Sequence, residues 1–220
     1  MLDVMFYEVF SEEQKVIQKY LPRNIQVRFT KKTIQESKHK TPPAALISIR
    51  TQSVVPFSWA NKIKGILTRS QGFDHLAKFR RESKKRISCG YLADYCSQAV
   101  AEHAIMAMMA LMRKLKKKIR HFNCFNRDGL TGSECGGKRV FVIGVGCIGK
   151  RIVQLTKALK MSVRGFDIDP RLKNFSYVSL KEGIKDADII FCALPLTAQT
   201  EGLLNSKLLK TAKPGVIFIF

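Results

Sequence analysis

An apolar run followed at once by spaced glycines constrains the fold of this chain more than any other feature of its sequence. Residues 140–143 read Val-Phe-Val-Ile, and residues 144–149 place glycine at their first, third and sixth positions. The first such glycine permits a tight turn, the second lets the backbone approach an anion, and the third lets a helix pack closely on a sheet. The pattern therefore predicts a strand, a loop and a helix whose N-terminus offers backbone N–H groups to a phosphate.

The sequence around this loop predicts an α/β fold. After residue 136 the expected strands are continuous apolar runs, which are typical of a parallel sheet covered on both faces. These strands are expected at 139–143, 162–166, 177–180, 188–193 and 216–220, and the helices between them at 148–160, 180–186 and 206–212. The first part of the chain shows the same alternation, with strands at 4–10, 25–30, 45–49 and 65–68 and a helix at 11–20. The whole pattern indicates a doubly wound arrangement.

The longest helical pattern runs from Ser97 to about Arg120. It is small and apolar in its first half and basic in its second. The residues expected on its buried face are Ala101, Ala104, Met108 and Leu111. A methionine-rich stripe of this kind indicates helix packing rather than a ligand site.

The chain is strongly basic. It has 39 Lys and Arg against 17 Asp and Glu, a formal charge of +22, and such an excess attracts anions from nucleic acid to lipid head groups. Two runs, at 78–86 and 113–118, suggest a nucleic-acid or polyanion binder as one hypothesis, and solvated helix faces as the alternative. No groove-reading motif accompanies the charge, so specific nucleic-acid binding is not expected.

The six cysteines never form a C-x-x-C pair, so neither a zinc knuckle nor a thioredoxin-like pair is indicated. The first residues lack the layout of a signal peptide, which favours a reducing, cytoplasmic location. The longest apolar stretch, 104–112, is too short to span a bilayer. We therefore expect no metal site and no membrane partner.

An acidic residue follows the second strand after the glycine loop. Asp167 stands eighteen residues beyond Gly149, where a carboxylate can accept hydrogen bonds from both ribose hydroxyls of an adenosine. It would repel the 2′-phosphate of NADP, so the spacing favours NAD. Asp169 is the alternative acid, but Pro170 follows it and the apolar strand has already ended.

Several stretches carry a family resemblance. In order they are Ile49–Thr51 with Val55 and Pro56, residues 68–74, residues 99–103, the glycine loop, residues 194–197 and residues 213–215. Their order and spacing resemble the D-isomer-specific 2-hydroxyacid dehydrogenases, which include D-lactate and phosphoglycerate dehydrogenases. The resemblance covers most of residues 45–220, and residues 1–44 are compatible with it.

The resemblance implies an NAD-dependent oxidoreductase that passes a hydride between nicotinamide and a D-2-hydroxyacid or 2-oxoacid. Residues 1–96 would form a flavodoxin-like substrate domain and residues 97–220 a Rossmann NAD-binding domain, with the helix region 97–120 making a homodimer contact. The cofactor-binding residues implied are Gly144, Gly146, Cys147, Ile148, Gly149, Asp167, Leu194, Pro195 and Thr200. Gln71 and Gly72 would hold the substrate carboxylate through backbone N–H groups, although an ordinary turn before a helix explains them equally well.

The resemblance also shows a departure. In the family the catalytic arginine, acid and histidine follow the strand that corresponds to residues 216–220, and this chain stops at Phe220. No catalytic residue is therefore assigned within it, its Rossmann domain is expected to be incomplete, and the 220-residue chain alone is expected to be inactive. The alternative function is a non-catalytic NAD-sensing binding protein, like the family's corepressors.

Overall fold

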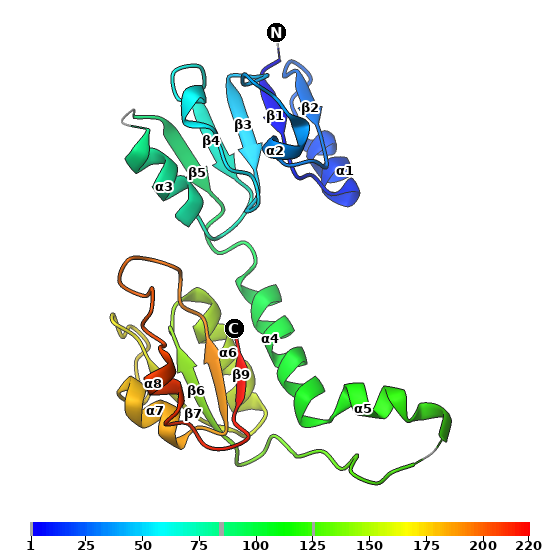
Figure 1. The fold of residues 1–220 in the computed structure, drawn as a ribbon, viewed down its shortest axis with the longest axis vertical. Helices are drawn as coiled ribbons and strands as arrows, with labels where there is room; N and C mark the ends of the chain where they lie inside the picture. Colours follow the sequence, from blue (N-terminus) through cyan, green and yellow to red (C-terminus); the bar gives the residue numbers. More distant parts are fainter. Residues whose placement is uncertain (1, 84–85, 125) are drawn as a thin grey trace. The chain divides into compact units, whose positions relative to one another are not determined.

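The computed structural model describes residues 2–83, 86–124 and 126–220, and it divides into two compact units (Figure 1). Unit 1 spans Met1–Tyr95 and unit 2 spans Cys96–Phe220. Lys84 and Lys85, which belong to the first cationic run, lie outside the described residues. Each unit has its own sheet and its own core, so the two are described separately.

Unit 1 is built on a five-stranded sheet in which every pairing is parallel, in the order β2-β1-β3-β4-β5. This is the flavodoxin-like order, which confirms the fold class expected for the first domain. The strands are β1 (Val4–Phe6), β2 (Val27–Phe29), β3 (Leu46–Ile49), β4 (Gly65–Thr68) and β5 (Ser88–Tyr91). The helices are α1 (Ser11–Tyr20), α2 (Ile34–Ser37), α3 (Asp74–Glu82) and the short η1 (Phe57–Trp59).

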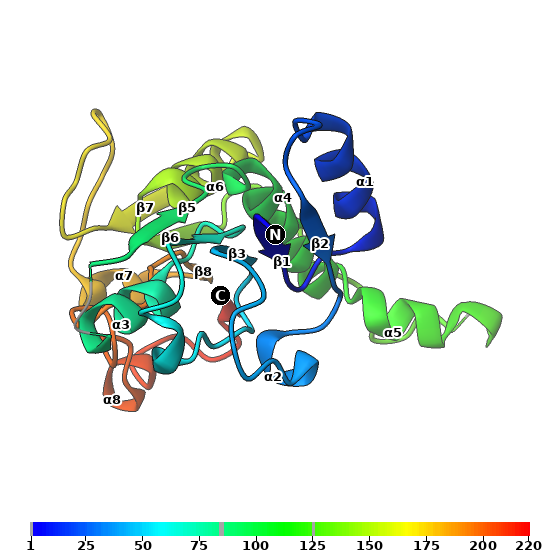
Figure 2. The same ribbon diagram turned by 90° about the horizontal axis from the view of Figure 1, so that it is seen from above.

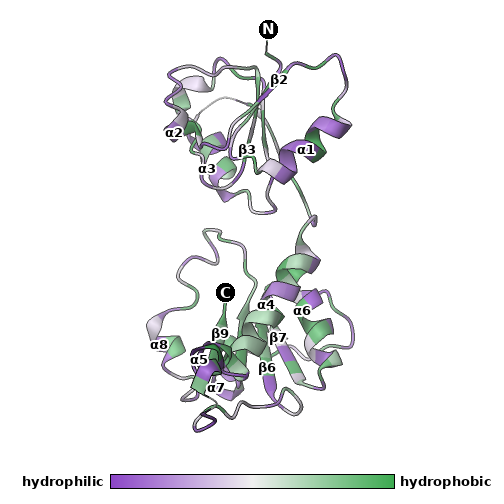
Figure 3. Cartoon of the chain, turned by 90° about the vertical axis from the view of Figure 1, so that its right-hand side faces the viewer, coloured by the Kyte–Doolittle hydropathy of each residue, from purple (hydrophilic) through white to green (hydrophobic). Residues whose placement is uncertain are grey.

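The core of unit 1 forms where apolar strand residues meet the helices. Tyr7, Ile47, Ile49 and Trp59 are each no more than 1% exposed. The α3 helix contributes Leu76 and Phe79 to the same cluster, and η1 contributes Trp59. Figure 3 shows the resulting pattern, with hydrophobic residues along the strands and hydrophilic residues on the outer helix faces.

Unit 2 contains a four-stranded parallel sheet in the order β7-β6-β8-β9. Its strands are β6 (Arg139–Ile143), β7 (Ser162–Phe166), β8 (Ile189–Cys192) and β9 (Ile217–Ile219). Its helices are α4 (Ser97–Met112), α5 (Leu115–Arg120), α6 (Cys147–Ala158), α7 (Leu180–Asp186) and α8 (Ser206–Leu209), with η2 (Phe122–Cys124) after α5. Figure 2 shows the same elements from above.

Strand β6 explains why the central strands are continuously apolar. Val140 and Val142 point into one core cluster with residues of α4 and α6, whereas Phe141 and Ile143 point into a second cluster with residues of α7 and α8. Successive side chains of a strand face opposite sides of a sheet, so both sides are buried here. The two-sided burial predicted from the sequence is confirmed.

Two of the expected elements were wrong, and the buried face expected on the long helix was wrong in part. Residues 177–180 form no strand, because Tyr177 makes a single parallel bridge to Gly165 and helix α7 begins at Leu180. The expected helix over 97–120 is divided into α4 and α5.

The break lies at Lys114, which adopts a left-handed conformation with φ of 54°. The carbonyl of Met112 accepts a hydrogen bond from the Ser133 N–H at 3.0 Å, and the Lys114 ammonium donates to the Gly129 carbonyl at 2.9 Å. A returning segment therefore takes a carbonyl that would otherwise continue the helix. These contacts are remote in sequence, so local periodicity gives no sign of them.

The break accompanies a shift of the buried face. The buried residues of α4 are Ser97, Ala101, Ile105, Met108 and Met112, whereas Leu111 is 57% exposed. The face of α4 that packs on α6 is therefore rotated from the one expected, although Ala101 and Met108 belong to both.

Candidate functional site

The glycine loop leaves the carboxyl end of β6 and leads directly into α6. Gly144 has a φ of +87°, a conformation that L side chains rarely adopt, and its N–H donates to the Phe166 carbonyl at 2.8 Å. The loop is thereby tied to the end of the neighbouring strand β7. The turn predicted at the first glycine is present.

The other two glycines of the loop stand in opposite surroundings. A Cβ at Gly149 would lie 1.9 Å from the carbonyl oxygen of Gly144, whereas a Cβ at Gly146 would meet no atom within 4 Å. Gly149 is buried and Gly146 is exposed. Gly149 therefore serves the packing of helix on loop, and the open space above Gly146 is available to a ligand that approaches the backbone.

Helix α6 begins at Cys147, with Gly146 in the N-cap position. The first N–H groups of a helix have no partner within it, and they lie at the positive end of the helix dipole. Cys147 is exposed and Ile148 is partly exposed, so their backbone N–H groups stand beside the open space at Gly146. A phosphate group fits this combination of free space, N–H groups and positive potential.

Asp167 follows β7 and reaches back to the loop. Its carboxylate accepts hydrogen bonds from the backbone N–H of Val145 at 2.7 Å and of Asp169 at 2.9 Å. A carboxylate offers about four lone pairs, so accepting positions remain for the hydroxyls of a sugar. The contact with Val145 places this acid next to the loop, as the spacing in the sequence predicted.

The arginines that could attract a further phosphate near Asp167 are already paired. Arg164 contacts Glu182 at 3.1 Å and also pairs with Asp186 on α7. Arg171 pairs with Asp169, and this contact raises the pKa of the Arg171 guanidinium. The negative charge of Asp167 is consequently not offset by an arginine bonded to it among the described residues.

The loop after β8 forms the other side of the site. Its backbone at Ala193 and the Leu194 side chain both lie within about 3 Å of the position a Cβ would take on Gly144. Farther along, the Thr200 hydroxyl donates to the Pro195 carbonyl at 2.5 Å, which closes the segment into a compact turn. Leu194, Pro195 and Thr200 thus lie on one loop, and Leu194 directly adjoins the glycine loop.

The topology explains why these three loops meet. Strand β6 lies between β7 and β8, so the chain leaves β6 toward one side and returns on the other. In open parallel sheets, ligands bind beyond the carboxyl ends of the strands at such a reversal. The glycine loop, Asp167 and the residues after β8 all follow carboxyl ends at this point.

In unit 1 the corresponding edge carries Gln71 and Gly72, which follow β4. The Ser70 hydroxyl donates to the Gly72 carbonyl at 2.7 Å, the Thr68 and Ser70 hydroxyls lie 2.7 Å apart, and His75 Nε2 lies 3.2 Å from the Thr68 hydroxyl. A carbonyl only accepts, and each hydroxyl has one proton, so Thr68 donates to Ser70 and His75 donates to Thr68. This chain of hydrogen bonds fixes the turn, and no pattern in the sequence indicated it. Burial lowers the pKa of His75, although Asp74 and Glu8 oppose the shift.

A second set of buried polar contacts was also missed from the sequence. Arg69 is 5% exposed and donates to the carbonyls of Tyr7 and Glu8 and to Glu13. The Glu8 carboxylate in turn accepts N–H groups from the segment after β3, including Arg50 at 3.0 Å. Because β1, β3 and β4 are adjacent, these contacts join the carboxyl ends of the three strands.

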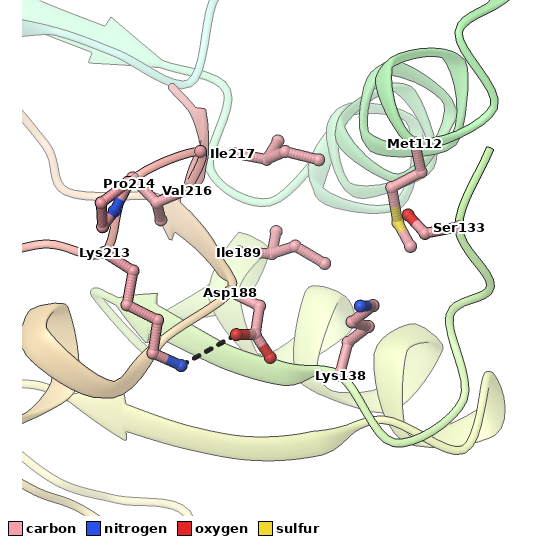
Figure 4. Close-up of a pocket in the computed structure, with 10 residues that line it drawn as sticks. Met112, Ser133, Lys138, Asp188, Ile189, Lys213, Pro214, Val216 and Ile217 are labelled. Atoms are coloured by element: carbon pink, nitrogen blue, oxygen red, sulfur yellow. Dashed lines mark hydrogen bonds and ion pairs between the residues drawn. The ribbon is translucent and has the colours of Figure 1, made fainter. Parts of the chain in front are cut away.

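The opposite edge of the unit 2 sheet holds a pocket of about 190 Å³ (Figure 4). The Lys213 ammonium donates to the Asp188 carboxylate there at 2.8 Å. Burial acts to raise the pKa of Asp188, but the Arg139 backbone N–H and Lys213 outweigh it and hold the pKa below its usual value. The pocket lies at the amino ends of the strands, away from the glycine loop, and two of its charged groups, Asp188 and Lys213, pair with each other.

The contact of Gly149 with the loop gives a stability prediction. The variant Gly149→Ala is expected to lower the free energy of unfolding by about 3 kcal/mol, at the upper end for an overpacked site, because backbone on both sides prevents relaxation. Urea denaturation followed by circular dichroism measures the change. The matched variant Gly146→Ala faces open space and should unfold like the unsubstituted chain, and an equal loss in both variants would contradict this assignment.

Comparison with known proteins relates this chain to the D-isomer-specific 2-hydroxyacid dehydrogenases. Residues 104–220 match the family profile described as D-isomer specific 2-hydroxyacid dehydrogenase, NAD binding domain. A 2-hydroxyacid dehydrogenase homolog from Schizosaccharomyces pombe is 30% identical over 167 residues, covering 72% of this chain and 50% of the relative. D-lactate dehydrogenase from Escherichia coli is 35% identical over 132 residues, covering 57% of this chain and 40% of the relative. This chain thus spans about half the length of the curated relatives it matches.

Solved structures agree with the fold. D-lactate dehydrogenase from Aquifex aeolicus, solved with NAD and lactic acid, matches with a TM-score of 0.82 and 25% identity, over 98% of this chain and 68% of that chain. The apo-structure of D-lactate dehydrogenase from Escherichia coli matches with a TM-score of 0.81 over 99% of this chain and 72% of that chain. The sequence identity of this second match is 24%, so it shows a shared fold and nothing more. Among the described residues, no helix is long and apolar enough to cross a membrane.

Proposed function

This chain belongs to the D-isomer-specific 2-hydroxyacid dehydrogenase family. We propose that it provides the cofactor-binding and substrate-binding parts of an NAD-dependent oxidoreductase. The reaction passes a hydride between the nicotinamide and the carbon that carries the hydroxyl of a D-2-hydroxyacid, or the carbonyl of the 2-oxoacid. The observation that carries the proposal is the Asp167 carboxylate bonded to the backbone of the glycine loop, with open space above Gly146. A dinucleotide needs both features at one sheet edge.

In this proposal unit 2 holds the cofactor. The backbone N–H groups of Cys147 and Ile148 bind the pyrophosphate, and Asp167 accepts hydrogen bonds from the adenosine ribose. Gly144 and Gly149 shape the loop, and Gly146 leaves room for the phosphates. The loop carrying Leu194, Pro195 and Thr200 covers another part of the cofactor. NAD, when bound, supplies the hydride acceptor or donor.

Unit 1 holds the substrate in the same proposal. The backbone N–H groups of Gln71 and Gly72 bind the carboxylate that every 2-hydroxyacid carries. The hydrogen bonds from His75 through Thr68 and Ser70 to the Gly72 carbonyl support this role, since they hold the turn in one conformation. A binding site held in one conformation loses less entropy when it binds its ligand.

The general acid and the carbonyl-polarising cation are assigned to no described residue. The resemblance gives these roles to an arginine, a glutamate and a histidine that match no position of residues 1–220. A non-catalytic NAD-sensing protein is the alternative function, since it requires only the cofactor half of the site. Turnover in a polypeptide that supplies the three residues discriminates between the two functions.

We also propose a homodimer through the helix region 97–120. Val100, Ala104, Ala107 and Leu111 recur at helical spacing on one side of α4, and Val100 and Leu111 are exposed by 41% and 57%. Such a face fits the isologous contact of a two-fold dimer. A cytoplasmic location is proposed as well, and the six free thiols suit its reducing conditions.

Cofactor choice tests the assignment of Asp167. The unsubstituted chain should bind NAD more tightly than NADP, because the 2′-phosphate would meet the carboxylate while Arg164 and Arg171 are paired with other acids. The variant Asp167→Asn should weaken NAD binding by about tenfold or more, because it loses hydrogen bonds to a charged group. It should also reduce the ratio of NAD affinity to NADP affinity. Calorimetric titration of both cofactors measures this. Equal or tighter NADP binding by the unsubstituted chain would remove Asp167 from its proposed role.

A further inference from the structure

Two polar side chains of unit 1 meet across the end of β4, where the proposed substrate turn begins. The sheet order places β4 between β3 and β5 (Figure 1). Arg50 comes directly after β3, and Tyr95 lies four residues after β5 ends at Tyr91. The Arg50 guanidinium donates to the Tyr95 hydroxyl at 3.5 Å. Their contact therefore spans the carboxyl end of the strand that leads into the Gln71–Gly72 turn.

Backbone hydrogen bonds hold this turn between the two segments that carry Arg50 and Tyr95. On one side, the Arg69 N–H donates at 2.8 Å to the carbonyl of Ile49, the residue before Arg50. On the other side, the Leu92 N–H donates to the Ser70 carbonyl at 3.1 Å. A ligand bound at the turn therefore has the segment of Arg50 on one flank and the segment of Tyr95 on the other.

The backbone at Arg50 is held in place by the buried Glu8 carboxylate. Glu8 accepts the N–H groups of Arg50 at 3.0 Å, Gln52 at 2.9 Å and Ser53 at 3.2 Å. It does so from a left-handed conformation with φ of 55°, which non-glycine residues seldom adopt. Such strain persists only where the surrounding contacts hold it, and it is common at functional sites. The loop therefore presents the Arg50 side chain from a fixed backbone.

The positive charge of Arg50 is only partly compensated within unit 1. Its side chain is 27% exposed, and its guanidinium lies over the Phe10 ring, 4.9 Å from the centroid. Its carboxylate partner is Glu13 at 3.3 Å, but the same oxygen of Glu13 accepts from the buried Arg69 at the shorter distance of 2.8 Å. One carboxylate thus serves two guanidinium groups. A guanidinium has five N–H donors, so Arg50 keeps donors for a ligand after its contacts with Glu13 and Tyr95.

We propose that Arg50 and Tyr95 form a second anion-binding subsite, so that the substrate is a 2-hydroxyacid or 2-oxoacid with a second carboxylate at the far end of its side chain. The inference rests on the proposed function, in which the first carboxylate binds the Gln71–Gly72 turn. The second carboxylate takes the remaining donors of Arg50 in a charge-assisted contact. The Tyr95 hydroxyl accepts from Arg50, so its own proton is available to the same carboxylate.

The chemistry of the subsite favours this substrate class over acids with alkyl or aromatic side chains. An apolar side chain packed against Arg50 would take water from a charged group and give it no partner in return. The exposed Phe10 ring could pack against such a side chain, but the Arg50 guanidinium already lies over it. A carboxylate instead replaces the water that it removes from the guanidinium.

The experiment titrates the 220-residue chain with D-2-hydroxyglutarate and with D-2-hydroxypentanoate, and follows the backbone amide shifts of Gln71 and Gly72 by NMR. The two acids have equal chain length, and only the first has a second carboxylate. No cofactor is added, so the result concerns unit 1 alone. We expect both acids to shift the turn, and the dissociation constant of the diacid to be about tenfold smaller, because it gains hydrogen bonds to a charged group.

Variants assign the preference to the subsite. Arg50→Gln should weaken diacid binding about tenfold and leave monoacid binding within about twofold. Arg50→Lys keeps the charge but loses the planar fork, so it should weaken diacid binding by only about threefold. Tyr95→Phe, which removes one donor, should cost about threefold as well.

The matched control is Arg28→Gln. Arg28 is exposed on the edge strand β2, and its substitution removes the same charge from unit 1 away from the turn. It should leave the affinity for both acids within about twofold, since screening limits the reach of an exposed charge. Thermal unfolding of each variant shows that unit 1 is folded, and Arg50→Lys retains the test if Arg50→Gln unfolds.

Three results would overturn the proposal. Equal affinity for the two acids, with shifts at Gln71 and Gly72, would remove the second subsite and leave the proposed dehydrogenase function intact. Equal losses in Arg28→Gln and Arg50→Gln would mean that the net charge of the chain alone attracts the diacid. Shifts at the turn with neither acid would contradict the substrate role of the turn itself, and the second subsite would fail with it.

Discussion

Residues 1–220 joined to the C-terminal part of D-lactate dehydrogenase from Escherichia coli are expected to oxidise NADH with 2-oxoacids, whereas the 220-residue polypeptide alone is expected to show no measurable turnover. The joined part is the sequence that follows the position equivalent to Phe220 in that relative, which this chain matches over 72% of its length in structure. The difference in rate should be at least about 10⁴-fold.

The size of this difference follows from two missing contributions. Hydride transfer leaves or takes a proton at the substrate oxygen, and a positioned acid–base group supplies about 10²- to 10⁴-fold of the rate. A positioned cation that polarises the carbonyl supplies about 10²- to 10³-fold more. The hydrogen-bond partners of His75 and Arg69 give these groups structural roles in unit 1. In the proposed function, the two units contribute the positioning of cofactor and substrate.

The assay follows NADH absorbance with a panel of 2-oxoacids. The joined polypeptide must first bind NAD and unfold cooperatively, which controls for a chimera that does not fold. Clear turnover by residues 1–220 alone would refute this account of catalysis. A folded, NAD-binding chimera with no turnover on any 2-oxoacid would favour the non-catalytic alternative.

Replacing Gly146 by valine is expected to abolish NAD binding and leave the thermal unfolding of the chain unchanged. A Cβ at Gly146 meets no protein atom within 4 Å, and its φ lies outside the left-handed region, so the folded chain accommodates the side chain. The same space is the one that the pyrophosphate would occupy next to the Cys147 and Ile148 N–H groups. The valine side chain therefore leaves the stability of the free protein unchanged but blocks the binding of NAD.

Calorimetric titration with NAD measures this effect, and the dissociation constant should rise by more than about 100-fold. The matched control is Gly136→Val, since Gly136 also has open space and no left-handed φ but lies before β6 and outside the loop. It should bind NAD like the unsubstituted chain. Unchanged affinity in Gly146→Val would mean that the loop is only a turn.

The four strands of the unit 2 sheet were all predicted from the sequence, and two of them were predicted with exact bounds. Arg139–Ile143 and Ser162–Phe166 were predicted with the bounds that the structure has. Strand β6 is a continuous apolar run after Arg139, as expected for a buried parallel strand, whereas the edge strand β7 alternates buried Val163 and Gly165 with less buried residues. In unit 1, Gly65–Thr68 was predicted correctly, but β5 and α3 were not assigned. Strand β5 reads Ser-Cys-Gly-Tyr and helix α3 is rich in charge, so neither shows a long apolar pattern.

The failures in the prediction come from contacts between residues far apart in the chain. The break between α4 and α5 depends on the Ser133 N–H, and the buried charge of Arg69 depends on the carbonyls of Tyr7 and Glu8, which directly follow β1 about sixty residues away. Local periodicity contains neither contact. The glycine loop and Asp167 were predictable because spacing along one βαβ unit determines their geometry.

The most direct test of the proposed cofactor site is a map of backbone amide shifts in the NMR spectrum of the 220-residue chain on addition of NAD. We expect the largest shifts at Val145, Cys147, Ile148, Gly149 and Asp167, with smaller ones in the loop after β8. A chain of charge +22 can also attract a dinucleotide without a built site, and that mode would place the shifts on its cationic surfaces. Shifts concentrated at residues 113–122, with the glycine loop unaffected, would contradict the assignment of unit 2 as the NAD-binding domain.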